Sequence, residues 1–135
     1  MTGVTPGELT IDSEYDIVTA RKAVRQAAME CGFGLTDVTR IVTAASELSR
    51  NIFVYAGTGT VRWQGVSRDT QGLEITFEDH GPGIDDVEQA LEPGYTTGKS
   101  LGMGLPGSKR LMDELEVTSA PGVGTTVVIR KWLRF

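Results

Sequence analysis

The sequence contains one cysteine, Cys31, and one histidine, His80, among its 135 residues. A lone cysteine cannot form a disulfide within the chain. Cys31 falls on the apolar face of an expected helix, where a thiol packs as a small hydrophobic group. Because the N-terminus also shows no signal-peptide pattern, we expect a protein that works in a reducing, cytoplasmic environment.

Long apolar runs and clusters of positive charge are also missing. No apolar run approaches the ~20 residues that a membrane-spanning helix needs. The formal net charge is −5, and the 13 Lys and Arg residues are scattered along the chain. We therefore expect no nucleic-acid partner and no membrane partner. The hydrophobic content of 39% is typical of a globular protein, and the length predicts one domain over residues 1–135.

Hydrophobic periodicity predicts an α+β fold. The pattern favours a two-layer α/β sandwich, with helices on one face of a mixed, mostly antiparallel sheet. The expected strands cover residues 8–12, 61–66, 73–79, 116–120 and 125–133, and the first of them is an edge strand. The expected helices cover residues 13–31, a segment that Thr36 caps and that ends before residue 56, residues 87–91, and residues 106–115.

Glu47 and Asn51 stand one helical turn apart in the second expected helix. The apolar stripe of that helix centres near Ala45 and Ile52, and both polar residues fall roughly 100–140° away from it. Side chains spaced i, i+4 can reach one common target, such as a hydrated metal ion and the groups bound to it. Solvated surface residues show the same spacing, so the pair alone does not decide between the two.

Asp79 ends the expected strand 73–79 on the face that carries its apolar residues. A carboxylate buried there without donors would cost several kcal/mol. It could accept a hydrogen bond from a flat heterocycle, such as the exocyclic amine of adenine, or it could be a turn residue that accepts from nearby backbone. Gly81 and Gly83 follow, where the backbone can turn tightly and approach another group closely.

The segment 92–107 is rich in Gly, Ser and Thr and has no apolar period, which is typical of a lid or of disorder. Within it, "GMGL" (102–105) precedes the helix expected from Pro106. Glycine amides at a helix N-terminus can bind phosphate oxygens. The spacing fits neither a P-loop nor a dinucleotide-binding fingerprint, and a lone Gly-x-Gly is often only a loop.

Taken in chain order, these motifs resemble those of the GHKL ATP-binding superfamily, whose domain is the Bergerat fold. The motifs are "ExxxN" at 47–51, "DxGxG" at 79–83, "GxG" at 102–104 and "GVGTT" at 122–126. Longer stretches are similar to one branch of that superfamily, the serine/threonine kinases that act as switches of the bacterial stressosome. These stretches are "EYDIVTARKAVRQAAMECGFG", "ASELSRNIFVYAG", "EDHGPGI", "GMGLPGSKRLMDE" and "VIRKWLR".

The resemblance implies a kinase that uses ATP and Mg²⁺. Asn51 would ligate the Mg²⁺ that the phosphates hold, and Glu47 would act as general base toward the substrate hydroxyl. Asp79 would bind the adenine amine, helped by Thr125 through its hydroxyl or a water. The other implied nucleotide-binding residues are Gly81, Gly83, Ile84, Lys99, Gly102, Met103, Gly104 and Leu105.

Lys99 and Arg50 have two interpretations each, and His80 has one. Lys99 could reach the β- or γ-phosphate, or it could be a solvated loop lysine. Arg50 could touch the nucleotide or a partner, or it could be a surface residue. His80 occupies the variable position of "DxGxG" and is interpreted as a spacer, because the sequence has no separate helical hairpin to carry a phosphoacceptor histidine.

The resemblance implies that STAS-domain stressosome proteins are the substrates, and that the released kinase binds and activates a PPM-type phosphatase. One alternative is an anti-sigma factor with kinase activity, which holds a sigma factor and phosphorylates its STAS-domain antagonist. Another is a non-catalytic module in which ATP only orders a docking surface. Arg21, Lys22 and Arg25 on the first helix could meet an acidic coiled coil of the phosphatase, or they could be a solvated helix face.

Overall fold

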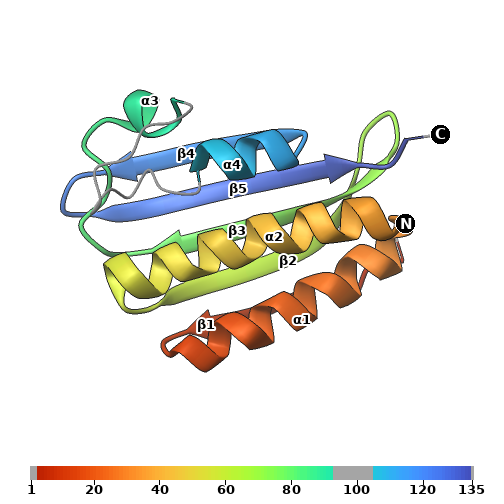
Figure 1. Cartoon of the computed structure of the whole chain (residues 1–135), viewed down its shortest axis with the longest axis horizontal. Helices are drawn as coiled ribbons and strands as arrows, with labels where there is room; N and C mark the ends of the chain where they lie inside the picture. The colour runs from red at the N-terminus through yellow and green to blue at the C-terminus, as the bar shows by residue number, and fades with distance from the viewer. Residues whose placement is uncertain (1–2, 93–104, 135) are drawn as a thin grey trace.

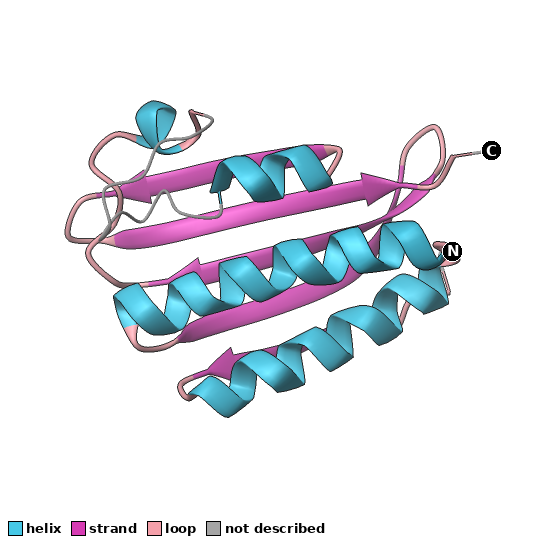
Figure 2. Ribbon diagram, in the orientation of Figure 1, coloured by secondary structure: helices cyan, strands magenta, loops and turns pink. Residues whose placement is uncertain are grey.

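The computed structural model describes residues 3–92 and 105–134. The described elements are arranged in two layers, with the long helices packed on one face of a single sheet (Figures 1 and 2). In chain order they are β1 (Gly7–Ile11), α1 (Glu14–Cys31), α2 (Leu35–Asn51), η1 (Ile52–Ala56), β2 (Gly59–Ser67), β3 (Gln71–Asp79), α3 (Val87–Ala90), α4 (Leu105–Leu111), β4 (Glu114–Ala120) and β5 (Gly124–Trp132).

The sheet has the strand order β1-β2-β3-β5-β4, and each described pairing is antiparallel. The predicted α+β sandwich, with β1 at an edge, is therefore confirmed, and the sheet is antiparallel rather than mixed. Strand β3 lies in the centre, between β2 and β5, and Leu73, Ile75 and Phe77 alternate into the core. The same alternation brings Asp79 to the helix-covered face at the end of the strand.

Helix α1 matches its expected bounds. The Ser13 side chain caps it by accepting a hydrogen bond from the Asp16 N–H, and Gly32 ends it with φ of 105°. The buried residues of α1, which include Cys31, face the core, as the periodicity predicts. Burial in this apolar layer raises the pKa of the Cys31 thiol, which fits the interpretation of Cys31 as a packing residue.

Helix α2 begins differently from the expectation. Its N-cap is Gly34, not Thr36, and no side chain caps it. The helix does not stop cleanly at its C-terminal end. It passes into the π-helical turn η1, which ends at Gly57 with φ of 82°. This widened turn follows Asn51 directly, and single π-helical turns are often found beside functional sites.

Helix α4 ends at Leu111, whereas helical signals were expected to continue to residue 115. The chain leaves the helix because β4 pairs with β5 from Glu114 onward, and the Asp113 N–H already donates to the Arg130 carbonyl at 3.0 Å. At the end of α4, the buried Lys131 ammonium donates to the Leu111 carbonyl at 2.7 Å. A cation at a helix C-terminus satisfies an otherwise unpaired carbonyl and interacts favourably with the helix dipole.

The sheet face away from the helices carries a charged cluster centred on Arg130. Its guanidinium contacts Glu74 at 2.7 Å, Glu116 at 2.9 Å and Glu114 at 3.1 Å. Partial burial alone would raise the pKa of Glu74, but hydrogen bonds from Gln64 and Arg130 outweigh it and hold that pKa below its usual value. Partial burial alone would lower the pKa of Arg130, but its interactions with Glu74, Glu116 and Glu114 outweigh burial and raise that pKa.

Candidate functional site

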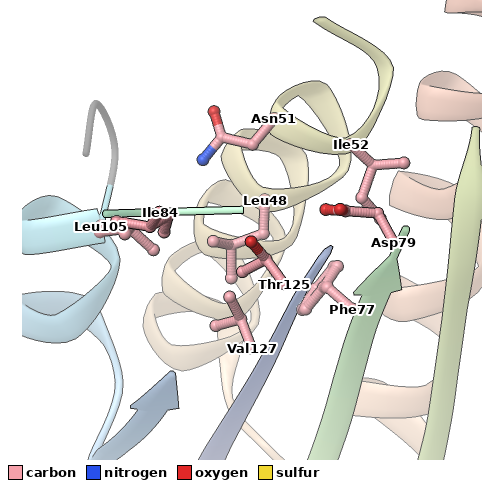
Figure 3. A pocket seen from close by; sticks show the side chains of 9 residues that line it. All are labelled: Leu48, Asn51, Ile52, Phe77, Asp79, Ile84, Leu105, Thr125 and Val127. Atoms are coloured by element: carbon pink, nitrogen blue, oxygen red, sulfur yellow. The ribbon is translucent and has the colours of Figure 1, made fainter. Parts of the chain in front are cut away.

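A pocket opens between α2, the C-terminal end of β3, the N-terminal end of β5 and the start of α4 (Figure 3). It measures about 350 Å³, including its open mouth. Apolar walls with a few polar groups are typical of small-molecule sites. The residues that line it are Leu48, Asn51, Ile52, Phe77, Asp79, Ile84, Leu105, Thr125 and Val127.

The pocket brings together five residues that the sequence singled out: Asn51, Asp79, Ile84, Leu105 and Thr125. They come from four separate parts of the chain, and the antiparallel sheet and α2 place them around one space. In Figure 3, the Asp79 carboxylate points toward Leu48 and Thr125, and the Asn51 amide points toward the side of the pocket that Ile84 and Leu105 line. The polar groups that the motifs predicted therefore share one pocket.

Glu47 does not line this pocket. It lies one turn before Asn51 on α2 and is half-buried. Arg50 and His80 are exposed and do not line the pocket either. The predictions for Lys99, Gly102, Met103 and Gly104 concern positions outside the described residues.

Asp79 has a structural role as well as a place in the pocket. Its Oδ1 accepts a hydrogen bond from the Gly81 N–H at 2.9 Å, so the turn interpretation is confirmed. Asp79 pairs across the sheet with Gly59 on one side and Thr125 on the other. The carboxylate is half-buried and held in position by the turn, which suits a fixed hydrogen-bond acceptor at the pocket wall.

Gly81 and Gly83 both lie where a side chain would not fit. A Cβ on Gly83, which has φ of 78°, would lie 2.3 Å from the Ala120 carbonyl oxygen. A Cβ on Gly81 would lie 2.7 Å from the Cβ of Ala56 in η1. The close approach predicted for these glycines is therefore seen against the protein itself, and it seats the 80–86 loop on β4 and on η1.

Two residues at the site were missed by sequence reasoning. Gly124 has φ of 139°, and a Cβ there would lie 2.2 Å from the Asp79 carbonyl oxygen, so only glycine allows β5 to run beside Asp79. Ser119 of β4 accepts a hydrogen bond from the Ile84 N–H at 2.7 Å and contacts the Thr125 hydroxyl at 3.0 Å. Gly124 stands inside the quoted "GVGTT" motif, but no sequence signal indicated Ser119.

The apolar wall was predicted only as core. Leu48 and Ile52 belong to the apolar stripe of α2, and Phe77 belongs to the buried face of β3. Their apolar side chains line the pocket together with its polar groups. A planar ring with a polar edge would be complementary to this arrangement, because it buries its faces against the apolar side chains and turns its edge toward Asp79.

The described residues contain no group of three or more His, Cys, Asp and Glu side chains able to hold a metal ion. Asn51 offers one carboxamide oxygen at the pocket. Magnesium keeps several waters and takes ligands from substrate phosphates, so one protein oxygen suits it when phosphates supply the others. Among the described helices, none is long and apolar enough to cross a membrane.

Comparisons with known proteins point to one family. The family model described as the histidine kinase-like ATPase domain matches residues 11–131. Serine/threonine-protein kinase RsbT of Bacillus subtilis (strain 168) is 50% identical over 125 residues, covering 92% of this chain and 94% of that protein. An anti-sigma F factor of Halalkalibacterium halodurans is 38% identical over 105 residues, covering 73% of this chain and 72% of that protein.

Solved structures show the same fold. The structure of the RsbU and RsbW domains of a Mycobacterium tuberculosis protein superposes with a TM-score of 0.69 at 19% identity, covering 96% of this chain and 33% of that chain. A histidine kinase domain from Erythrobacter litoralis superposes with a TM-score of 0.53 at 27% identity, covering 73% of this chain and 45% of that chain. The chain therefore belongs to the histidine kinase-like ATPase domain family, with an ATP-binding kinase domain, and it is a homologue of serine/threonine-protein kinase RsbT.

Proposed function

We propose that the chain transfers the γ-phosphoryl group of ATP to a serine or threonine of a STAS-domain stressosome protein, and that the released kinase binds and activates a PPM-type phosphatase. The observation that carries this proposal is the meeting of Asn51, Asp79 and Thr125 in one pocket. The 50% identity to RsbT over 92% of the chain supports the kinase class over the anti-sigma alternative, for which the relative quoted above is 38% identical over 73%.

ATP would lie with its adenine in the apolar part of the pocket. Asp79 would accept a hydrogen bond from the adenine amine, and Thr125 would contribute beside it. Asn51, on the α2 side, would offer its oxygen to a Mg²⁺ ion held by the phosphates. Magnesium neutralises the charge that develops on the phosphates during transfer. The phosphates would be held by backbone of the glycine-rich segment, where Lys99, Gly102, Met103 and Gly104 belong to the proposed site and Leu105 starts α4.

Glu47 is the proposed general base. It lies one turn from Asn51 and outside the adenine pocket, a placement that suits a group facing the acceptor protein rather than the nucleotide base. Its carboxylate would take the proton from the acceptor hydroxyl, whose oxygen then attacks the γ-phosphorus as the bond to the β-phosphate oxygen breaks and ADP leaves. A carboxamide at this position could not take the proton.

Helix α1 is the proposed docking surface for the phosphatase. Tyr15, Val18, Lys22, Arg25 and Met29 follow each other at spacings of three and four residues on the exposed side, which is the spacing of a coiled-coil seam. Tyr15 is 71% exposed and Met29 is 58% exposed. Within the described residues, Lys22 and Arg25 form no ion pair. A helix with apolar and acidic residues would complement this seam.

The transferase activity is tested by incubating the chain with ATP, Mg²⁺ and a STAS-domain protein encoded near it, followed by mass spectrometry of the acceptor. Phosphate on a serine or threonine of that protein is the expected result. Glu47→Gln should abolish transfer and leave ATP affinity nearly unchanged, whereas Glu14→Gln, at an exposed position of α1, should leave both unchanged. Transfer by Glu47→Gln at the normal rate would exclude Glu47 as the base.

The partner surface is tested by reversing charge on α1. The double variant Lys22→Glu and Arg25→Glu should lose phosphatase binding, while Lys109→Glu with Arg110→Glu on α4 makes the same change in net charge and should retain it. Equal binding by both double variants would exclude α1 as the docking surface. Tight binding to a sigma factor, with no binding to the phosphatase, would instead favour the anti-sigma alternative.

A further inference from the structure

Asp79, Thr125 and Ser119 form a row across three neighbouring strands. Asp79 of β3 pairs with Thr125 of β5, and Thr125 pairs with Ser119 of β4. Asp79 and Thr125 line the pocket, and Figure 3 shows the Thr125 side chain beside the carboxylate. Ser119 does not line the pocket, and it lies next to Thr125 on the neighbouring strand. The row therefore links the pocket wall to a serine that lies outside it.

The hydrogen bonds of Ser119 determine the direction of each bond in this row. Its Oγ lies 2.7 Å from the Ile84 N, 3.0 Å from the Gly124 carbonyl oxygen and 3.0 Å from the Thr125 Oγ1. The Ile84 N–H can only donate, and the Gly124 carbonyl can only accept. A serine hydroxyl has one proton and two lone pairs. Its proton must therefore go to Gly124, and its second lone pair remains for Thr125.

Thr125 consequently donates its own single proton to Ser119. The Thr125 oxygen then has no proton left for the pocket and can only accept there. The ionised Asp79 carboxylate can also only accept. The two polar groups at this end of the pocket thus both require a donor from the ligand. A purine with an amine at position 6 supplies N–H groups, whereas a 6-oxo purine turns a carbonyl oxygen toward them.

We propose that Ser119 is a positioning residue for purine selectivity: by taking the Thr125 proton, it keeps Thr125 an acceptor toward the base, so that the site favours 6-amino over 6-oxo nucleotides. This inference rests on the proposed binding of ATP in the pocket. It goes beyond that role because it assigns part of the selectivity to a residue that does not touch the nucleotide.

The test compares the dissociation constants of ATP and inosine triphosphate, which carries an oxygen at position 6. In Ser119→Ala, the Thr125 hydroxyl can rotate and donate to a 6-oxo group, so the preference for ATP over inosine triphosphate should fall about tenfold, the equivalent of one neutral hydrogen bond. Ser119→Thr keeps a hydroxyl and should keep the preference. Ser119→Cys keeps the shape with a weakly hydrogen-bonding thiol and should behave like alanine, even if the alanine variant does not fold.

A double-mutant cycle with Thr125→Val separates selectivity from general damage. If Ser119 acts through Thr125, Ser119→Ala should not change the nucleotide preference once Thr125 is valine. A purely structural role would weaken both nucleotides equally, and an unchanged ratio in Ser119→Ala and Ser119→Cys would overturn the inference while leaving ATP binding intact. Failure of the unmodified protein to bind either nucleotide would instead overturn the proposed function, and the inference with it.

Discussion

Gly83 and Gly122 provide a matched pair of sites for a stability measurement. Their φ angles are 78° and 76°, so an alanine at either position meets the same backbone penalty. Their surroundings differ. A Cβ on Gly83 would lie 2.3 Å from the Ala120 carbonyl oxygen, whereas a Cβ on Gly122 would have no neighbour within 4 Å. The difference between Gly83→Ala and Gly122→Ala therefore measures the steric contact alone.

The expected magnitudes follow from these geometries. A left-handed conformation costs an alanine roughly 1–2 kcal/mol, and this is the whole expected effect of Gly122→Ala on the free energy of unfolding. Gly83→Ala adds a clash with a carbonyl that already accepts a hydrogen bond from the Val123 N–H. Overpacking of this kind typically costs ~1–3 kcal/mol more, so the total should be about 3 kcal/mol.

Urea unfolding of both variants gives the two free energies, and calorimetric titration gives their ATP affinities. Gly83 precedes Ile84, which lines the pocket and whose N–H donates a hydrogen bond to the Ser119 hydroxyl. Displacement of the loop should therefore weaken ATP binding in Gly83→Ala, whereas Gly122→Ala should retain it. Equal losses of stability in the two variants, or normal ATP affinity in a destabilised Gly83→Ala, would refute the reasoning that Gly83 seats the loop on β4.

Two further predictions concern ionised groups. Lys131→Met should lower the free energy of unfolding by ~1–3 kcal/mol and speed hydrogen exchange at the end of α4, because the Leu111 carbonyl loses its buried donor, whereas the exposed Lys109→Met should do neither. Equal exchange in both variants would contradict this role. Hydrogen bonds from Gln64 and Arg130 lower the pKa of Glu74 in the folded state, so its contribution to stability is present above the unfolded pKa and is lost as pH falls through the lower, folded pKa. Chemical denaturation at several pH values should show a smaller loss of stability on acidification in Glu74→Gln, and an identical loss would exclude the contribution.

The polar residues of the pocket could be predicted because their signals are local. Strict alternation along β3 placed Asp79 on the core side of its strand, and helical spacing placed Asn51 off the apolar stripe of α2. Their meeting with Thr125 in one pocket follows from the pairing of β3 with β5. Spacing alone could not reveal that pairing, and the resemblance implied only that Asp79 and Thr125 both act on the adenine.

Features that depend on contacts between distant segments were predicted less well. The end of α4 was placed too late because β4 pairing, which is non-local, takes over from helical propensity at Glu114. Thr36 has the chemistry of a cap, but the backbone enters α2 two residues earlier at Gly34. Ser119 had no signal at all, because its importance comes from the register that sets it opposite Thr125.

The most direct test of the account is calorimetric titration of ATP and Mg²⁺ into the unmodified chain and into Asp79→Asn. Asparagine can still accept the hydrogen bond from the Gly81 N–H, so the fold and the unfolding temperature should change little. Its amide nitrogen replaces an acceptor with a donor that faces the adenine amine. We expect ATP affinity to fall about a hundredfold, or ~3 kcal/mol. Unchanged affinity in a folded Asp79→Asn would contradict the claim that this pocket binds adenine through Asp79.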